Sequence, residues 1–163
     1  MPEWAKHGFN VGEFIGKNTR EIREPEIIEC AEKLRAEYKK VGAVGYCYGG
    51  WVVCRLGAKG KNLVDAVSMG HPSLLTKEDL DGVAVPIQIL APEIDAAYTA
   101  ELKEHTFKAL QKSNVIFEYQ HFPGVEHACF CRGDPDKPGE RDAMARGKSA
   151  AVYWFQQWLH NVE

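Results

Sequence analysis

The chain has 163 residues, of which 45% are hydrophobic and 26% charged, and its formal net charge is −3. This length predicts a single domain with a substantial core, and the composition is ordinary for a soluble globular protein. The small negative charge argues against electrostatic binding to nucleic acid or to anionic membranes. No apolar run approaches the length of a transmembrane helix.

The five cysteines predict neither a disulfide framework nor a zinc site. Their number is odd, no CxxC pair occurs, and the spacing of Cys129 and Cys131 is too short for structural zinc. Residues 1–14 lack the apolar stretch of a signal peptide. We therefore expect free thiols in a reducing compartment, which favours a cytoplasmic protein with no metal or organic cofactor.

The first part of the chain predicts a lead-in, a helix, a strand and a second helix. Residues 1–24 show no clear pattern and read as a loop with room for one short helix or strand. Residues 25–40 repeat apolar side chains at helical spacing, and Pro25 suits the first helical turn. A short buried strand is expected over 41–46, and the apolar run that ends near Leu56 predicts the next helix.

Three more strands and two long helices follow in alternation. The strands are expected over 63–69, 83–90 and 115–122, and the helices over about 98–112 and 140–160. Thr76 and Asp79 form a capping pair over a short helical turn, and Pro86 confines the paired part of its strand to Ile87–Ala91. Residues 91–95 and 123–139 read as loops. The alternation predicts one α/β domain over 1–163, with a mainly parallel sheet and helices on both faces.

The stretch Val41–Trp51, VGAVGYCYGGW, carries the main chemical motif. Gly45-Tyr46-Cys47-Tyr48-Gly49 matches the nucleophile-elbow pattern G-x-S-x-G, with cysteine in place of serine. A nucleophile on such a sharp turn is strained and crowded by neighbouring backbone, so Gly45 and Gly49 must be small. The next helix is expected to point its N-terminus at Cys47, which favours a thiolate there and an oxyanion beside the backbone N–H of Tyr48. A buried structural cysteine is the alternative interpretation.

Two later loops supply the other residue types that acyl transfer needs. Asp95 follows the third predicted strand and His127 follows the fourth, so nucleophile, acid and histidine occur in the order of an α/β-hydrolase triad. His127 would accept the thiol proton and later protonate the leaving group, while Asp95 would orient the imidazole. Taken singly, Asp95 could cap the following helix and His127 could be an ordinary loop histidine.

Four motifs give the chain a resemblance to the fungal branch of the dienelactone hydrolase family, which has the α/β-hydrolase fold. They are GYCYGG at 45–50, GHPS at 70–73, APEID at 91–95 and FPGVEHACFCRGDP at 122–135. The resemblance covers about residues 41–163 and implies a triad of Cys47, Asp95 and His127. It also suggests that Arg132 contacts an anionic group of the substrate, although a solvated loop arginine is an equal alternative.

The chain departs from the family pattern in two ways. Ala128 stands where glycine usually follows the triad histidine, and Cys129 and Cys131 add thiols that could trap an oxidised Cys47. We also expect no counterpart here of the family's N-terminal strands, which supply a second oxyanion N–H and an acidic residue near the thiol. We therefore expect a partial sheet of about four strands, whose bare edge invites self-association. Two explanations of the missing strands remain open: a natural short form of the protein, or a sequence from which the first strands have been lost.

Three functions remain open at this point. The leading one is a cysteine hydrolase that cleaves an activated ester or enol-lactone, such as a dienelactone, through an acyl-enzyme. A thiolate suits good leaving groups because a tetrahedral intermediate expels it more readily than an ordinary alkoxide. The second is a weakly active or inactive homologue that serves as an interaction module. The third is a redox-sensing thiol protein in which a second cysteine resolves oxidised Cys47.

Overall fold

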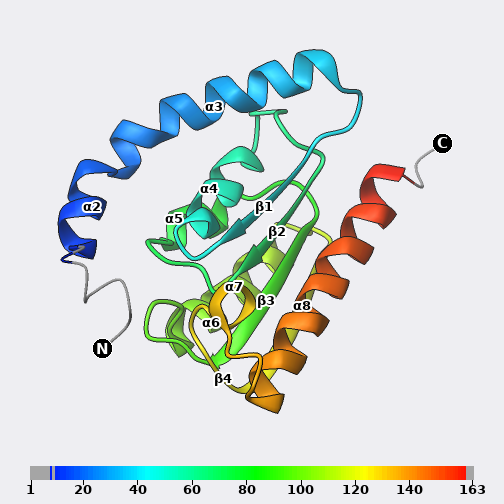
Figure 1. Cartoon of the computed structure of the whole chain (residues 1–163). Coiled ribbons are helices and arrows are strands. Elements are labelled where there is room, and N and C mark those ends of the chain that lie inside the picture. The colour runs from blue at the N-terminus through cyan, green and yellow to red at the C-terminus, as the bar shows by residue number, and fades with distance from the viewer. Residues whose placement is uncertain (1–7, 9, 161–163) are drawn as a thin grey trace.

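A four-stranded sheet forms the centre of the computed structural model, which describes residue 8 and residues 10–160 (Figure 1). The strands are β1 (Gly42–Tyr46), β2 (Ala66–Gly70), β3 (Ile87–Ile94) and β4 (Phe117–Glu126). They lie in the order β1-β2-β3-β4, and every neighbouring pair is parallel. This arrangement confirms the α/β fold class expected from the sequence.

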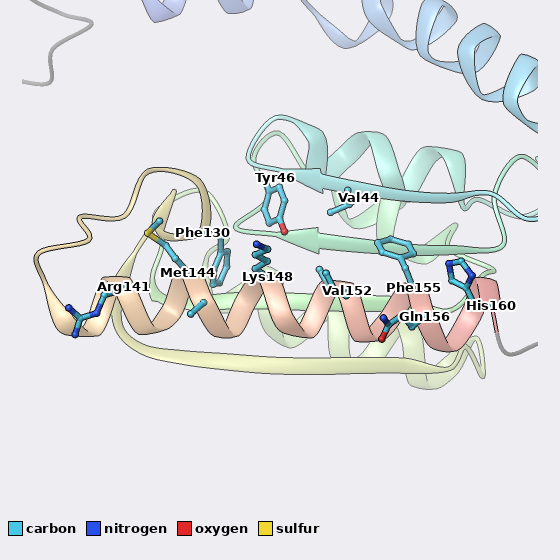
Figure 2. A pocket seen from close by; sticks show the side chains of 12 residues that line it. Val44, Tyr46, Phe130, Arg141, Met144, Lys148, Val152, Phe155, Gln156 and His160 are labelled. Carbon is cyan, nitrogen blue, oxygen red and sulfur yellow. The ribbon is translucent and has the colours of Figure 1, made fainter.

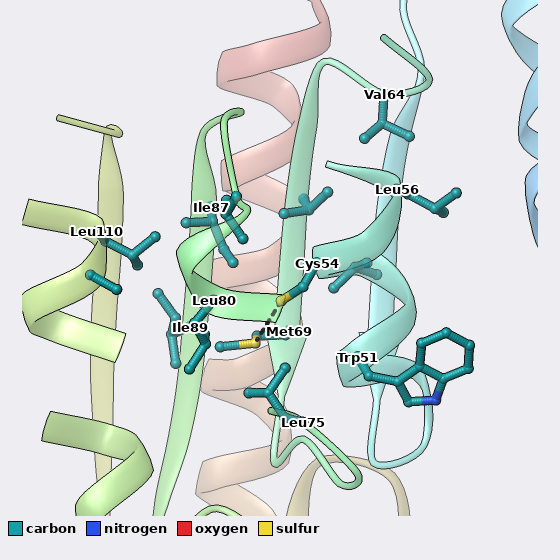
Figure 3. Packing of buried hydrophobic residues seen from close by; sticks show 14 of the residues in the cluster. Trp51, Cys54, Leu56, Val64, Met69, Leu75, Leu80, Ile87, Ile89 and Leu110 are labelled. Carbon is teal, nitrogen blue, oxygen red and sulfur yellow. Dashed lines mark hydrogen bonds between the residues drawn. The ribbon is translucent and has the colours of Figure 1, made fainter. Parts of the chain in front are cut away.

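Helices cover both faces of this sheet. The described helices are α2 (Val11–Lys17), α3 (Arg20–Glu37), α4 (Gly49–Leu56), α5 (Lys77–Asp81), α6 (Ala100–Lys112), α7 (Cys129–Arg132) and α8 (Pro138–Phe155), and a π-helical turn, Gln156–His160, continues α8. Figure 3 shows α4 and α6 on one face of the strands and α8 behind them. Helix α4 packs on β1 and β2, whereas α8 packs on β2, β3 and β4. None of the helices in the described part of the chain is both long and apolar enough to cross a membrane.

Most of the core lies between the sheet and the layer formed by α4, α5 and α6 (Figure 3). Trp51 and Cys54 of α4 are fully buried there, together with Met69 of β2 and Ile89 of β3. A second cluster lies under α8 and contains Leu90, Phe122, Val125, Cys129 and Ala143. Neighbouring residues of β3 therefore face opposite apolar layers, which explains why this strand is a continuous hydrophobic run in the sequence.

The N-terminal helix begins earlier than the sequence predicted. Helix α3 starts at Arg20 after the N-cap Thr19, so Pro25 lies inside the helix and not in its first turn. Proline at this depth removes one helical hydrogen bond. Tertiary contacts anchor the preceding turn, because the Arg20 guanidinium makes two hydrogen bonds, of 2.8 and 2.6 Å, to the buried carboxylate of Asp79. The part of the expected lead-in over residues 1–7 lies outside the described residues.

Parts of two segments that were expected to be loops form regular secondary structure. Strand β3 continues to Ile94 and β4 to Glu126, and these two residues pair with each other beyond the end of β2. Residues 129–132 form the short helix α7. The other local predictions agree better: β3 begins directly after Pro86, and Thr76 and Asp79 form the expected capping box of α5.

Strand β1 lies at an end of the described sheet and pairs only with β2. The side chain of Val44 on this strand is 52% exposed. Between β1 and α8 lies an open groove of about 840 Å³, lined mainly by apolar side chains. In Figure 2, Tyr46 of β1 and Phe155 of α8 point into the space between the two elements. The expected bare edge is therefore present among the described residues, with an apolar groove beside it.

Candidate active site

Cys47 occupies the sharp turn between β1 and α4 and has a left-handed backbone, with φ at +51°. A Cβ atom on Gly45 would lie 2.0 Å from the carbonyl oxygen of Gly49, so only glycine fits at position 45. A Cβ on Gly49 would meet open space, which corrects the expectation that position 49 must be small. The second tight position is Gly50, whose Cβ would lie 2.2 Å from that of Pro72. The elbow is thus wedged against both its own helix and the turn after β2.

The three residues expected to form a triad lie in contact at the carboxyl ends of their strands. His127 follows β4 directly, and its Nε2 is 3.2 Å from the Sγ of Cys47. Asp95 follows β3 directly, and each of its carboxylate oxygens is 2.9 Å from Nδ1 of His127. Because β3 and β4 continue to pair beyond the end of β2, Asp95 and His127 lie beside the elbow at the carboxyl edge of the sheet.

Asp95 is held in place by its own loop. Its side chain is completely buried, and Oδ1 accepts hydrogen bonds from the backbone N–H groups of Ala97 and Tyr98 at 2.9 and 3.0 Å. The alternative role as the cap of α6 does not apply, because Thr99 is the N-cap of that helix. Asp95 therefore has a rigid, dry position from which it can orient the imidazole of His127.

The electrostatics of the site favour a thiolate beside an imidazolium. The hydrogen bond from His127 lowers the pKa of Cys47 to about 7, although burial opposes this shift. The hydrogen bond to Asp95 raises the pKa of His127 to about 9. Burial works against ionisation of Asp95, but its bonds to His127 and to two backbone N–H groups outweigh burial and hold its pKa below the usual range. When the pair holds a single proton, that proton thus lies mainly on His127 and not on Cys47.

Two residues of the turn after β2 also contact Cys47, and the sequence predicted a role for neither of them. The Oγ of Ser73 is 3.3 Å from the Sγ of Cys47 and 3.4 Å from Nε2 of His127. Nδ1 of the buried His71 accepts the backbone N–H of Cys47 at 3.2 Å. The available signal was the GHPS motif, because its polar residues follow a parallel strand and must lie at the same edge of the sheet as the elbow.

The remaining predicted site residues lie around this centre. The backbone N–H of Tyr48 makes a hydrogen bond to the thiol of Cys47 and contributes to its low pKa. Arg132 ends α7, is exposed, and forms no ion pair with a described side chain. Its charge reaches the site, because it helps to lower the pKa of His71. Arg132 therefore lies near the candidate site, with its side chain exposed to solvent.

All five cysteines are free thiols, and two of them lie on α7. Burial raises the pKa of Cys129 to about 12, so this thiol is a poor nucleophile. Cys131 is exposed, and both burial of its sulfur and the charge of Cys47 raise its pKa. No group of three or more side chains suited to hold a metal ion occurs among residues 10–160.

A nucleophile at an elbow, with a histidine and a buried acid after two later parallel strands, is the arrangement of the α/β hydrolases. Within that class, the sequence model of the dienelactone hydrolase family matches residues 6–159. The chain belongs to this family, as its motifs suggested.

Curated fungal relatives support this membership. The chain is 33% identical over 147 residues to Hydrolase tropI of Talaromyces stipitatus, a match that covers 88% of this chain and 57% of that protein. It is 30% identical over 131 residues to Hydrolase pyvD of Aspergillus violaceofuscus, covering 80% of this chain and 52% of that protein. The chain therefore spans about half the length of the curated relatives it matches.

Solved structures share the fold at low sequence identity. A dienelactone hydrolase-like promiscuous phosphotriesterase from metagenomic libraries aligns with a TM-score of 0.70 and 19% identity. The alignment covers 91% of this chain and 65% of that one. The likeness shows that most of the chain shares the fold of this larger protein.

Proposed function

We propose that the chain is a cysteine hydrolase of activated esters and enol-lactones, with Cys47 as nucleophile, His127 as general acid and base, and Asp95 as the group that orients His127. The observation that carries this proposal is the unbroken series of contacts from Sγ through the imidazole to the carboxylate, at 3.2 and 2.9 Å. The family suggests dienelactone-like substrates, and Arg132 would bind a substrate carboxylate beside the reacting centre.

The reaction would pass through an acyl-enzyme. The thiolate of Cys47 attacks the acyl carbon, and the backbone N–H of Tyr48 stabilises the oxyanion that forms. His127 then donates its proton to the leaving oxygen, so that an enol or phenol departs and a thioester remains. Neutral His127 next removes a proton from water, the hydroxide attacks the thioester, and the thiolate of Cys47 leaves again as the carboxylic acid is released.

A burst assay with p-nitrophenyl acetate tests this proposal. We expect one p-nitrophenol per chain in the first turnover, because acylation of a thiolate by a phenyl ester is fast and thioester hydrolysis is slower. The burst should vanish in Cys47→Ala and persist in Cys30→Ser, which removes an exposed thiol of α3. A folded wild-type protein without a burst would refute the hydrolase and favour an inactive homologue.

Peroxide treatment separates the hydrolase from a redox sensor. Peroxide should abolish the burst by oxidising Cys47, and a thiol reductant should restore it if the sulfur has stopped at the sulfenic acid or a disulfide. A disulfide between Cys47 and Cys131 in a protein that never hydrolyses the ester would favour the sensor instead.

A further inference from the structure

We propose that the Ser73 hydroxyl is a fourth functional group of this site. It donates a hydrogen bond to the Cys47 thiolate and keeps the sulfur facing His127. This inference deepens the proposed function and rests on Cys47 being the nucleophile. No role for the residue followed from the sequence, and the structure points to it through three separate features of the turn after β2.

The first feature is how firmly the backbone of Ser73 is attached to the nucleophile. Its N–H donates to the carbonyl oxygen of Cys47 at 2.8 Å, and the N–H of Cys47 in turn donates to the carbonyl of Gly70 at 3.1 Å. Pro72 fills the space beside Gly50, and His71 has a positive φ of 35°. The turn is thus built onto the elbow, so the position of Ser73 relative to Cys47 does not depend on a flexible loop.

The second feature is the triangle of reacting atoms. The Ser73 Oγ lies 3.3 Å from the sulfur and 3.4 Å from Nε2 of His127, while the sulfur and Nε2 are 3.2 Å apart. These are the hydrogen bonds that the described residues offer to this hydroxyl. A hydroxyl can donate one bond and accept others. When Cys47 is a thiolate and His127 an imidazolium, the hydroxyl donates to the sulfur and accepts from Nε2–H, so both of its contacts are matched to the charged pair.

The third feature is His71, which leaves the charge of this pair undisturbed. Its Nδ1 accepts the N–H of Cys47, so its proton lies on Nε2, which is buried with no hydrogen-bond partner among the described residues. Burial lowers the pKa of His71 to about 4. The ring stacks on Phe130 and lies 5.0 Å from the ring of His127. At neutral pH this second histidine is therefore uncharged. Ser73 is the polar side chain that contacts the Cys47 sulfur together with His127.

Other ionisable groups interact with Cys47, with His127 or with one another around the site, and they must be considered in any pH experiment. They lie after β2, after β3, after β4 and on α7, and they are His71, Asp95, His127, Cys131 and Arg132. Replacing Ser73 by alanine changes none of these groups. It also preserves the backbone bond to Cys47, so it removes the hydroxyl alone.

The test is the pH dependence of Cys47 alkylation by iodoacetamide, followed by mass spectrometry of the modified peptide. This readout reports the thiolate and does not require hydrolysis, so it remains decisive even if the hydrolase proposal fails. In Ser73→Ala we expect the apparent pKa of Cys47 to rise by about half a unit to one unit, because a charge-assisted hydrogen bond is lost. Acylation by p-nitrophenyl acetate near neutral pH should slow by roughly two- to sixfold, because the fraction of Cys47 present as thiolate falls.

Two variants distinguish the hydroxyl from a merely structural effect. Ser73→Thr retains the hydroxyl and should titrate like the wild type, and so should Ser149→Ala, which alters an exposed serine of α8. An alkylation pKa that is the same in Ser73→Ala as in the wild type would overturn the proposal. So would an equal rise in Ser73→Ala and Ser73→Thr, because the hydroxyl would then not be the cause.

Discussion

Replacing Asp95 by asparagine should collapse the thiolate–imidazolium pair. The ratio of the charged pair to the neutral pair is ten raised to the difference between the two pKa values. With pKa values of about 7 for Cys47 and about 9 for His127, this ratio is at most roughly 10² to 1, because each value already includes the attraction of the other group. With the ordinary values of 9.0 and 6.5 it would be roughly 1 to 300. Asp95→Asn removes the largest cause of the raised His127 pKa but leaves the contact with Cys47, so its ratio should lie between these limits.

The assay is kcat/KM for p-nitrophenyl acetate from about pH 5 to about pH 10. In the wild type, activity should rise as Cys47 loses its proton near pH 7 and fall as His127 loses its proton near pH 9. In Asp95→Asn the alkaline limb should move down by more than about one unit, and the maximum should fall roughly 10- to 100-fold. Asp136→Asn, the same change at an exposed loop position, should do neither. An unmoved alkaline limb in Asp95→Asn would refute the role of the carboxylate in holding the proton on His127.

Three further changes test the scaffold. Gly45→Ala should yield no folded, active protein because its Cβ would lie 2.0 Å from a backbone oxygen, whereas Gly49→Ala should keep its burst because its Cβ meets open space. Arg20→Ala should lower the free energy of unfolding in urea by about 2–3 kcal/mol, because it leaves a buried carboxylate of α5 without its ion-pair partner. Arg23→Ala, which breaks an exposed ion pair, should lower it by under about 1 kcal/mol. Equal losses in the two variants would contradict the importance of the buried pair. If the β1 edge pairs with a second copy, gel filtration should give a dimer or larger species for the wild type and a monomer for Val44→Lys; a monomeric wild type would rule this out.

Local sequence signals were sufficient for the elements whose stability is mainly local or strongly apolar. The apolar runs of β1, β2 and the start of β3, the capping box of α5 and the long helices α6 and α8 all lie near their predicted positions. The signals were insufficient where distant contacts stabilise an element. Pro25 suggested a helix start, but the ion pair of Arg20 with Asp79 stabilises an earlier one. The outer halves of β3 and β4 contain Pro92 and Pro123, yet the two strands continue to pair with each other beyond the end of β2.

The sequence by itself determined the fold class, the family and the chemical identity of the candidate site. Hydrophobic periodicity defines the order of strands and helices, and in a parallel sheet the residues after successive strands must meet at one edge. Only the tertiary structure decided the distances at that edge, because hydrogen bonding and pKa shifts depend on separations of a few tenths of an ångström. It brought Ser73 and His71 against Cys47, buried Cys129 while leaving Cys131 exposed, and left a groove beside β1. These features arise where segments far apart in the chain pack together. Among them, the GHPS motif indicated only that Ser73 and His71 lie at the edge of the sheet that carries Cys47, and not that they contact it.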